Sequence, residues 1–510
     1  MIDLGSNSWR LVIYTYDASP TSPWWKPSDE LYEAVRIGEG LGETGYLSEA
    51  AMARGLETLD IFARFCQASG LRHEDVHAFA TSAIRDAGNR EEYLRQIQLQ
   101  TGYQVEVLSG EAEAHYGYVA AINSSTLVDG VVLEIGGGSL QLIDVAGRRQ
   151  RNLASFPLGA VRMTERFLAG EPDRPARKKD IQRLREFVRT EVAKSGWFPD
   201  SGGRLVGTGG AVRNLAAASQ RESYGALGGI GLGVQGYLLQ TSALSGLVDQ
   251  LAEMTPLQRR QLSGIKPSRG DIILAAAVTL QSVLELGGVE GIEVTEAGLR
   301  DGIFLARTIL GEEDPLLPNV REAAVNNLAI QYEADLPHTE HVAELALQMH
   351  SSLEQTGIFK PQPGERELLW AAAMLHDVGM TISYDDHHKH SRYLILGAEL
   401  PGFDPRERAL IAQIARYHRK GTPKLGAWAK LGRPGDEQML ARCAVILRLA
   451  EHLERGRDQS VRRASLQSDG QSVALHLLAS GDLTLPRWSI ERYGDDEAFE
   501  RVFGRPLVVG

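Results

Sequence analysis

Short apolar runs alternate with longer segments of helical spacing over residues 1–308. Residues 11–13 and 131–133 have the length and composition of buried strands, whereas residues 49–70 space their apolar side chains as an amphipathic helix does. Residues 76–89 and 103–122 each predict a short strand, a polar turn and the start of a helix. Strands that alternate with helices predict an α/β architecture whose turns gather at the strand ends.

The pattern changes at the acidic, proline-bearing segment GEEDPLLPN, residues 311–319. Beyond it, residues 341–355 and 441–456 have helical spacing with little strand signal, whereas residues 461–479 alternate apolar and polar positions. We therefore expect four domains: two α/β lobes at residues 1–124 and 125–308, an all-α domain at 309–458, and a small α+β domain at 459–510.

Composition narrows the class of protein. A chain of 510 residues is too long to fold around a single hydrophobic core. Its content of 43% hydrophobic and 24% charged residues is ordinary for a globular enzyme. The formal net charge of -12 argues against wholesale binding of nucleic acid, so an anionic ligand requires a local basic site. The two cysteines lie far apart, and the longest apolar run falls short of the roughly 20 residues that span a membrane. We expect a cytoplasmic protein that binds no membrane.

A weak internal repeat carries the first candidate chemistry. Asp3-Leu-Gly-Ser-Asn-Ser and Glu134-Ile-Gly-Gly-Gly-Ser each place an acid and a glycine turn before a strand-like run. Two such hairpins predict two similar lobes that face one ligand. Asp3 and Glu134 offer the oxygen ligands that Mg²⁺ prefers, although a strand-end acid can also cap nearby N–H groups. The expected cofactor is Mg²⁺, with Mn²⁺ as its alternative.

Glycine-rich turns can bind phosphate through successive backbone N–H groups. A third such turn, in LVGTGGAVRNLAA, leads into a helix whose N-terminus favours anions. One glycine turn alone is usually structural, but three of them, two behind an acid, favour phosphate binding. The predicted phosphate-binding residues are Ser6, Asn7, Ser8, Gly136, Gly137, Gly138, Ser139, Gly207, Thr208, Gly209 and Gly210.

Hydrolysis of a phosphoanhydride also requires a base that positions water. Glu111 and Glu113 in SGEAEAHYGY lie at a predicted strand-to-helix turn, where either can instead enrich the first helical turn in negative charge. The planar fork of Arg85 can clamp phosphate oxygens, with an ion pair to Asp86 as the simpler alternative. The basic run RPARKKDIQRLR is expected to be a solvated helix face, or else a track for a polyanion.

Six motifs occur in the order found in one enzyme family. IDLGSNSWRLVI, ATSAIRDAGN, SGEAEA, IGGGS, GTGGAVRNLA and GLRDG together resemble the exopolyphosphatase and guanosine pentaphosphate phosphohydrolase family over residues 1–308. The resemblance implies two ribonuclease-H-like lobes, of the actin, sugar kinase and heat-shock ATPase type, with the active site in the cleft between them. It also implies that Glu113 activates water, that Arg85 binds phosphate and that Glu134 is the metal-associated acid.

The chain departs from that family at two positions. Glu134 stands where an aspartate is usual, which keeps the charge and lengthens the side chain. Leu140 and Gln141 follow IGGGS where many members have Thr-Glu, so Gln141 offers a metal only a neutral oxygen. Family members usually carry a few residues ahead of the first motif. We therefore expect a first strand that is either unusually short or shortened by a start assigned too late.

The helical region contains a second set of metal-ligand residue types. His338 precedes one predicted helix, the pair His376-Asp377 lies on another, and Glu451 lies on a late one. They resemble the ligands of the HD metal-dependent phosphohydrolase superfamily, in which the last is normally aspartate. The alternative to a divalent-metal site is a retained fold with hydrogen-bonded core residues at these positions. Two nearby clusters are expected to be exposed loops or an entry path for a polyanion, and they contain His387, His388, His390, His418, Arg419 and Lys420.

The predicted activity is Mg²⁺-dependent release of terminal orthophosphate from linear polyphosphate, with guanosine pentaphosphate 5′-phosphohydrolase as the alternative within the fold. A guanosine tetraphosphate-binding regulatory module with weak or no hydrolysis is the alternative from another class. A kinase is disfavoured because the chain has no nucleotide fingerprint beyond the glycine turns. The expected ligands are thus polyphosphate or guanosine penta- or tetraphosphate, with no specific nucleic acid, and the resemblance implies a homodimer.

Overall fold

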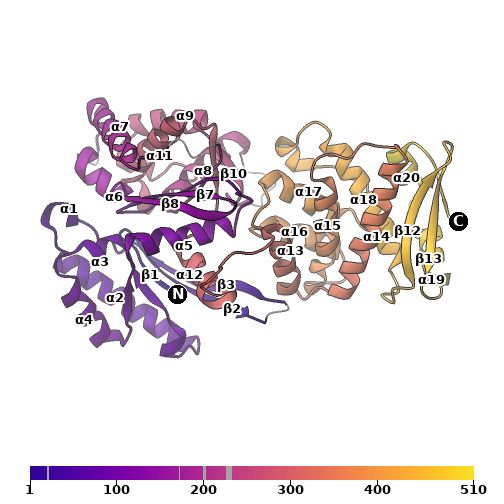
Figure 1. Cartoon of the computed structure of the whole chain (residues 1–510), viewed down its shortest axis with the longest axis horizontal. Helices are drawn as coiled ribbons and strands as arrows, with labels where there is room; N and C mark the ends of the chain where they lie inside the picture. Colours follow the sequence, from indigo (N-terminus) through magenta and orange to yellow (C-terminus); the bar gives the residue numbers. More distant parts are fainter. Residues whose placement is uncertain (20–21, 172, 199–202, 226–231, 495, 510) are drawn as a thin grey trace. The chain divides into compact units, whose positions relative to one another are not determined.

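The computed structural model describes residues 1–19, 22–171, 173–198, 203–225, 232–494 and 496–509. The chain forms two compact units (Figure 1). Unit 1 comprises Met1–Gly225 and Val234–Val320, and unit 2 comprises Ala226–Gly233 and Arg321–Gly510. Unit 1 is a mixed α/β structure, whereas unit 2 is mainly helical (Figure 1).

The first lobe of unit 1 is built, within the described residues, on a five-stranded sheet in the order β3-β2-β1-β4-β5. Trp9, Phe62 and Tyr93 lie fully buried in its core, where α2 and α4 cover the sheet. The elements are β1 (Ile2–Leu4), β2 (Trp9–Asp17), β3 (Trp24–Glu33), α1 (Leu41–Thr44), α2 (Glu49–Ala68), β4 (Ala78–Ala80), α3 (Ser82–Asp86), α4 (Arg90–Thr101) and β5 (Val105–Val107).

The second lobe contains a sheet whose described strands run in the order β10-β11-β9-β6-β7-β8. Its core surrounds α11, which contains the longest apolar run of the sequence and whose residues from Ile273 to Leu284 are all buried. The elements are β6 (Gly130–Ile135), β7 (Leu140–Ala146), β8 (Arg149–Phe156), α6 (Ala160–Met163), α7 (Lys178–Ala193), β9 (Leu205–Thr208), α8 (Gly210–Tyr224), β10 (Tyr237–Gln240), α9 (Thr241–Glu253), α10 (Pro256–Arg259), α11 (Ile273–Gly287) and β11 (Gly291–Val294).

The two lobes repeat one arrangement of strands. β1 pairs antiparallel with β2 and parallel with β4, and β6 pairs antiparallel with β7 and parallel with β9. The register places Asp3 opposite Arg10 and Glu134 opposite Gln141. The acid-bearing hairpins predicted from the sequence therefore occupy equivalent positions in the two sheets.

Two helices join the lobes of unit 1. α5 (Gly110–Ile122) and α12 (Leu299–Phe304) pack so closely that a Cβ added to Gly302 would lie 1.9 Å from the carbonyl oxygen of Tyr116. Beside them, Tyr14 of β2 stacks on Phe304 with ring centroids 4.0 Å apart. Both helices are therefore fixed against the strands that carry the candidate site.

Unit 2 has a helical region followed by a small three-stranded sheet with two helices among its described residues. Backbone N–H groups of Ala464 and Leu466 in β12 donate to the side chains of Gln348 and Ser352 in α14, so the sheet packs directly on the helices. The elements are α13 (Val320–Gln331), α14 (Leu336–Gln355), α15 (Glu365–Leu375), α16 (His387–Gly397), α17 (Pro405–Arg416), α18 (Asp436–Leu453), β12 (Val461–Ser468), β13 (Val473–Ala479), α19 (Thr484–Tyr493), α20 (Asp496–Phe503) and β14 (Leu507–Val509).

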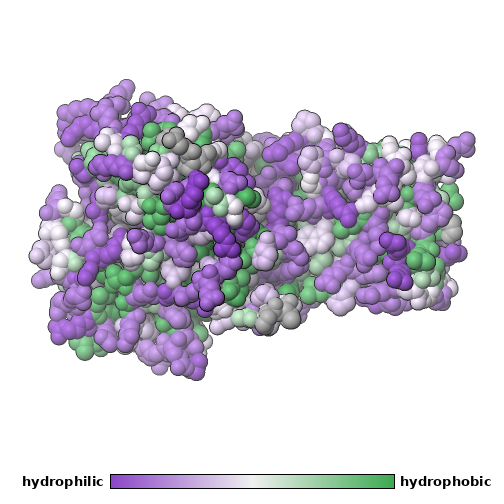
Figure 2. Space-filling view, viewed as in Figure 1, coloured by the Kyte–Doolittle hydropathy of each residue, from purple (hydrophilic) through white to green (hydrophobic). Residues whose placement is uncertain are grey.

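Short 3-10 or π-helical segments complete the list of elements: η1 (His73–Asp75), η2 (Thr164–Leu168), η3 (Pro267–Arg269), η4 (Leu305–Leu310), η5 (Val378–Thr381) and η6 (Gly426–Leu431). Hydrophilic residues cover most of the face of each unit that Figure 2 shows. Lys178, Lys179 and Arg183 are exposed on α7, as expected of a solvated helix face. None of the described helices is long and apolar enough to cross a membrane.

A packed glycine in α12 and an exposed glycine in α9 should respond in opposite ways to substitution by alanine. Gly302→Ala should lower the free energy of unfolding by about 1–3 kcal/mol, because the added methyl group overlaps the backbone of α5. Gly246→Ala, in the exposed interior of α9 with no described atom within 4 Å, should raise it by about 0.5–1 kcal/mol. Calorimetric melting of the two variants checks both signs, and a Gly302→Ala variant as stable as the parent would contradict the packing.

Candidate functional site

The acid-bearing hairpins of the two lobes line one cavity of about 110 Å³ in unit 1. Asp3 from β1, Glu134 from β6 and Glu113 from α5 all reach it. The hairpin turns also line it, with Ser6, Asn7, Ser8, Gly136 and Gly137, as do Gly209 and Gly210 at the start of α8. The structure therefore brings together most of the predicted site.

Glu113 is held in place by two hydrogen bonds. α5 begins after Ser109, whose hydroxyl accepts the N–H of Ala112. One carboxylate oxygen of Glu113 accepts from Arg85 Nη1 at 2.8 Å, and the other accepts from the hydroxyl of Ser139 at 3.1 Å. Burial raises the pKa of Glu113, against the opposing effect of Arg85. Glu111 is exposed and does not line the cavity, so the structure separates the two candidate bases.

Arg85 lies behind Glu113 and is not among the residues that line the cavity. Besides Glu113, its guanidinium donates to the carbonyl oxygen of Leu108 at 3.0 Å and lies 3.4 Å from Asp86. The structure therefore bears on both roles that the sequence suggested for Arg85, the binding of phosphate and the ion pair with Asp86. The Asp86 pair is present, and Arg85 contacts the candidate base, so its predicted role in binding phosphate stays a prediction.

Asp3 and Glu134 differ in how their charges are compensated. Asp3 Oδ2 lies 3.4 Å from the guanidinium of Arg300, and burial raises the pKa of Asp3 against that charge. Glu134 Oε2 is buried with no hydrogen-bond partner among the described residues. Burial, followed by the charges of Glu113 and Asp3, raises the pKa of Glu134 to about 8. A carboxylate oxygen without a partner beside two further carboxylates fits a divalent cation.

Backbone geometry explains why glycines form the turns. A Cβ on Gly138 would lie 2.4 Å from the hydroxyl oxygen of Ser82, so glycine lets the β6-β7 turn approach the first lobe. Gly209 has a φ of 100°, and a Cβ there would lie 2.5 Å from the carbonyl oxygen of Ile135. Gly138 lines a neighbouring cavity with Gly137 rather than the one that contains the carboxylates.

Four predicted phosphate-binding residues do not line this cavity: Gly138, Ser139, which donates to Glu113, and Gly207 and Thr208. Gly207 and Thr208 belong to strand β9 and not to the turn, and neither lines the cavity. The hydroxyl of Thr208 donates to the carbonyl oxygen of Ala297, and a Cβ on Gly207 would lie 2.5 Å from Ile292. The strand continues further than the glycine pattern suggested, so of the four residues predicted in this third turn only Gly209 and Gly210 line the cavity.

Gln141 is linked to the candidate base Glu113 through the hydroxyl of Ser139. Its side chain is buried and does not line the cavity, and its Nε2 donates to the hydroxyl of Ser139 at 2.9 Å. Ser139 in turn donates to Glu113. The residue predicted to weaken metal binding therefore helps to orient the candidate base.

Sequence reasoning missed the arginines of the cavity. Those among its described lining residues are Arg10, Arg213, Arg269 and Arg300. Arg213 and Arg300 follow the glycines of GTGGAVRN and GLRDG, so the motifs contained a signal that was not used. Arg269 packs over Gly210, where a Cβ would lie 2.3 Å from its guanidinium. Together they supply the local basic site that an anionic ligand requires in a chain of net negative charge.

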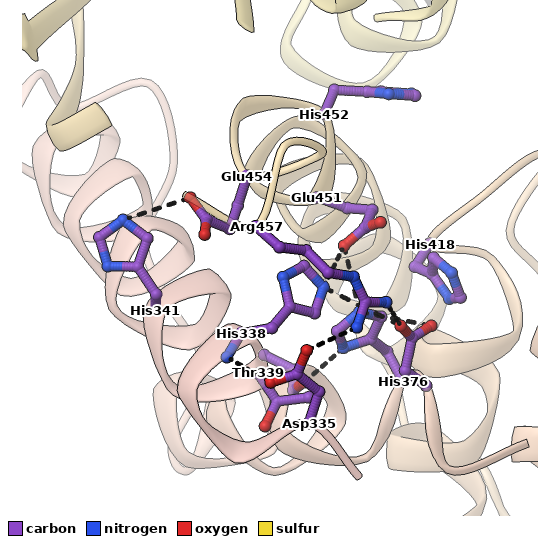
Figure 3. Close-up of polar contacts among 12 residues, drawn as sticks. Asp335, His338, Thr339, His341, His376, His418, Glu451, His452, Glu454 and Arg457 are labelled. Atoms are coloured by element: carbon purple, nitrogen blue, oxygen red, sulfur yellow. Dashed lines mark hydrogen bonds and ion pairs between the residues drawn. The ribbon is translucent and has the colours of Figure 1, made fainter. Parts of the chain in front are cut away.

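Unit 2 brings together the second predicted set of ligands (Figure 3). His338 from α14 and His376 after α15 have Nε2 atoms 3.1 and 3.2 Å from Glu451 Oε2, in α18. His376 also lies 3.6 Å from Asp377. Burial opposes protonation of His376, but Asp377 and Glu451 raise its pKa to about 9. Figure 3 shows His341 paired with Glu454 on one side of this group, and His452 apart from it.

The histidines expected in exposed loops are mostly buried, so that expectation was wrong. His387, His388 and His418 are each less than 7% exposed, whereas His390 and Arg419 are half-buried and Lys420 is exposed. His387 and His418 join Asp377 in a second group of metal-ligand atoms. Flanking Asp, Lys and Arg residues made these segments resemble solvated loops, but α16 and α17 turn the histidines inward.

Comparisons with known proteins find related sequences for both units of the chain. The model of the Ppx/GppA phosphatase family matches residues 29–309, and the model of Ppx/GppA phosphatase domain III matches residues 320–484. A guanosine-5′-triphosphate,3′-diphosphate pyrophosphatase of Vibrio vulnificus is 27% identical over 100% of this chain and 97% of its own length. A protein of the same name from Aeromonas hydrophila is 26% identical over 93% of this chain and 91% of its own length.

Among solved structures, an exopolyphosphatase from Cytophaga hutchinsonii matches with a TM-score of 0.54 and 25% identity, over 60% of this chain and 96% of that one. The two-lobed α/β unit and its carboxylate- and arginine-lined cavity, with these matches, define a phosphatase fold. The chain belongs to the Ppx/GppA phosphatase family.

The unpaired carboxylate of Glu134 predicts a pH-dependent stability. Because its pKa rises from 4.5 to about 8 on folding, the folded protein keeps a proton that the unfolded chain releases between those values. With a chelator present, the free energy of unfolding should fall as the pH rises through this range, by at most about 1.4 kcal/mol per pH unit. Glu134→Gln should remove this slope, measured by urea unfolding at several pH values.

Glu111→Gln is the matched control for this measurement, because Glu111 is exposed and outside the cavity. Its slope should equal that of the parent protein. Parallel pH profiles for the parent and Glu134→Gln would contradict the assigned environment of Glu134.

Proposed function

We propose that unit 1 hydrolyses the terminal phosphoanhydride bond of a phosphate chain and releases orthophosphate. The observation that carries this proposal is the position of Glu113, a buried carboxylate oriented by Arg85 and Ser139 at a cavity that also holds Asp3 and Glu134. A carboxylate fixed in this way can orient an attacking water and accept its proton.

Binding of the phosphates falls to the glycine turns and the arginines. Gly136, Gly137 and Gly209 line the cavity, and backbone N–H groups in turns of this kind can stabilise oxyanions without reorganisation. The N–H of Gly136 itself donates to the carbonyl oxygen of Ser139, so it is not one of the groups free to bind phosphate. Arg213 and Arg300 reach the same cavity, where a guanidinium can bind the equatorial oxygens of a transferred phosphoryl group. These groups favour the more negative transition state, which is what accelerates the reaction.

Asp3 and Glu134 are the residues that would hold a divalent cation, Mg²⁺ or Mn²⁺. When bound, such a cation neutralises phosphate charge and positions the terminal group. The unpaired Oε2 of Glu134 supports this assignment. We include in the proposal a cytoplasmic location, from the cysteine content and the short apolar runs, and a homodimer, from the family resemblance.

The proposed substrate is linear polyphosphate, with guanosine pentaphosphate as the second candidate. Similarity to an exopolyphosphatase structure supports the first, and the names of the Vibrio and Aeromonas relatives support the second. Both substrates end in a phosphoanhydride, so the terminal chemistry at Glu113 is the same for both.

Glu113→Gln should lower kcat for orthophosphate release by about 10²- to 10⁴-fold, because the amide cannot accept a proton from water. The substitution is isosteric, so the melting temperature and the affinity for substrate should change little. Glu111→Gln, two residues away and exposed, should keep kcat within a factor of about two. Turnover by Glu113→Gln near the level of Glu111→Gln would exclude Glu113 as the base.

The two substrates should be separated by measuring kcat/KM for purified polyphosphate and for guanosine pentaphosphate with one preparation. We expect polyphosphate to give the higher value. A higher value for guanosine pentaphosphate would assign the chain to the second activity. Tight binding of guanosine tetraphosphate without phosphate release from either substrate would contradict hydrolysis and indicate a regulatory module.

A further inference from the structure

Imidazole orientation in unit 2 points to a function for the buried histidines. The Nδ1 atoms of His376, His387 and His418 each lie 2.5 to 2.9 Å from the carbonyl oxygen of the residue three positions earlier. A carbonyl oxygen can only accept, so each Nδ1 carries a hydrogen. When these rings are neutral, as a bound cation requires, each Nε2 lone pair is directed away from the backbone and toward Asp377 and Glu451, which is the orientation of metal-ligating histidines.

The contact between His387 and His418 requires a positive charge. Their Nε2 atoms are 3.1 Å apart. With both Nδ1 atoms protonated, two lone pairs face each other in a buried site, and neither ring can donate to the other. A bound cation or an added proton must lie between them.

The spacing of the facing atoms agrees with coordination of metal ions. Two ligands about 2.1 Å from one ion lie roughly 3.0 to 3.4 Å apart at octahedral and tetrahedral angles. Glu451 Oε2 is 3.1 Å from His338 Nε2 and 3.2 Å from His376 Nε2, and Asp377 Oδ1 is 3.3 Å from His387 Nε2. These distances and the one between His387 and His418 all fall in that window.

Asp377 connects the two groups. Its Oδ1 faces His387 and His376, while its Oδ2 lies 3.9 Å from His338 and accepts from Arg457 at 3.0 Å. Arg457 also donates to Asp335 at 2.7 Å, so it closes one side of the site as Figure 3 shows. Asp377 thus has carboxylate oxygens near histidines of both groups, which is the position of a bridging ligand in a two-metal centre. Its contacts to His376 and His338 are longer than its contact to His387.

We propose that unit 2 binds two first-row transition-metal ions, of the Mn²⁺, Fe²⁺ or Zn²⁺ class, with Asp377 as the bridging ligand. His338, His376 and Glu451 hold one ion, and His387 and His418 hold the other. The imidazole ligands select these ions over Mg²⁺, which prefers oxygen. This centre is independent of the oxygen-lined cavity proposed for phosphate hydrolysis in unit 1.

The test loads the metal-depleted full-length chain with Co²⁺ in excess Mg²⁺ and counts the ions retained after gel filtration. The parent chain should retain about two Co²⁺ with the visible absorption of imidazole ligation. His387→Ala/His418→Ala should retain about one, and Asp377→Asn should bind both more weakly. His390→Ala, on the same helix and half-buried, is the matched control and should retain about two.

Equal Co²⁺ retention by His387→Ala/His418→Ala and His390→Ala would overturn the proposal. The absence of bound Co²⁺ in the parent chain would also overturn it, and would indicate that a proton rather than a metal ion lies between His387 and His418. Should the histidine variants fail to fold, X-ray absorption of the cobalt-loaded parent decides the question. We expect about two imidazole ligands per ion, and oxygen ligation alone would contradict the centre. Mg²⁺-dependent phosphate release should be the same in His387→Ala/His418→Ala and in the parent, which separates this proposal from that for unit 1.

Discussion

Repulsion among Asp3, Glu113 and Glu134 is the constraint on which the cavity of unit 1 depends. Burial removes the water that would screen these carboxylates, so each of them must gain a partner or keep a proton. Arg300 compensates Asp3, while Arg85 and Ser139 compensate Glu113. Glu134 has no such partner among the described residues and its pKa rises to about 8. Glu134 must therefore keep a proton or gain a divalent cation.

Duplication of the hairpin explains how the fold assembles this cluster. β1 and β6 are central strands of their sheets, so the acid on each is fixed on both sides by neighbouring strands. α5 then places Glu113 between them, and its packing on α12 at Gly302 allows little freedom. Groups held this rigidly need no reorganisation when charge develops in a transition state, which is the main source of electrostatic catalysis.

The sequence predicted what depends on local pattern. The hairpins, the strand-turn-helix segments and the order of the helical region follow from turn residues and periodicity, and the structure has them. Local pattern alone could not separate Glu111 from Glu113, because they share one helical turn and only the packing of α5 buries the second. The family resemblance was what favoured Glu113. Gly207 and Thr208 were misplaced because a strand and a turn can share the same glycines. His387 and His418 were misjudged because burial between helices is set by contacts distant in sequence.

The central claim is that the cavity of unit 1 directs water at a terminal phosphorus atom. The most direct measurement is a single turnover of polyphosphate in water enriched in the heavy isotope of oxygen, followed by mass spectrometry of both products. Our account predicts a single labelled oxygen in the released orthophosphate and none in the remaining chain. Label in the remaining chain with unlabelled orthophosphate, as attack at the penultimate phosphorus would give, or transfer of the phosphoryl group to another acceptor with no release of orthophosphate, would contradict it.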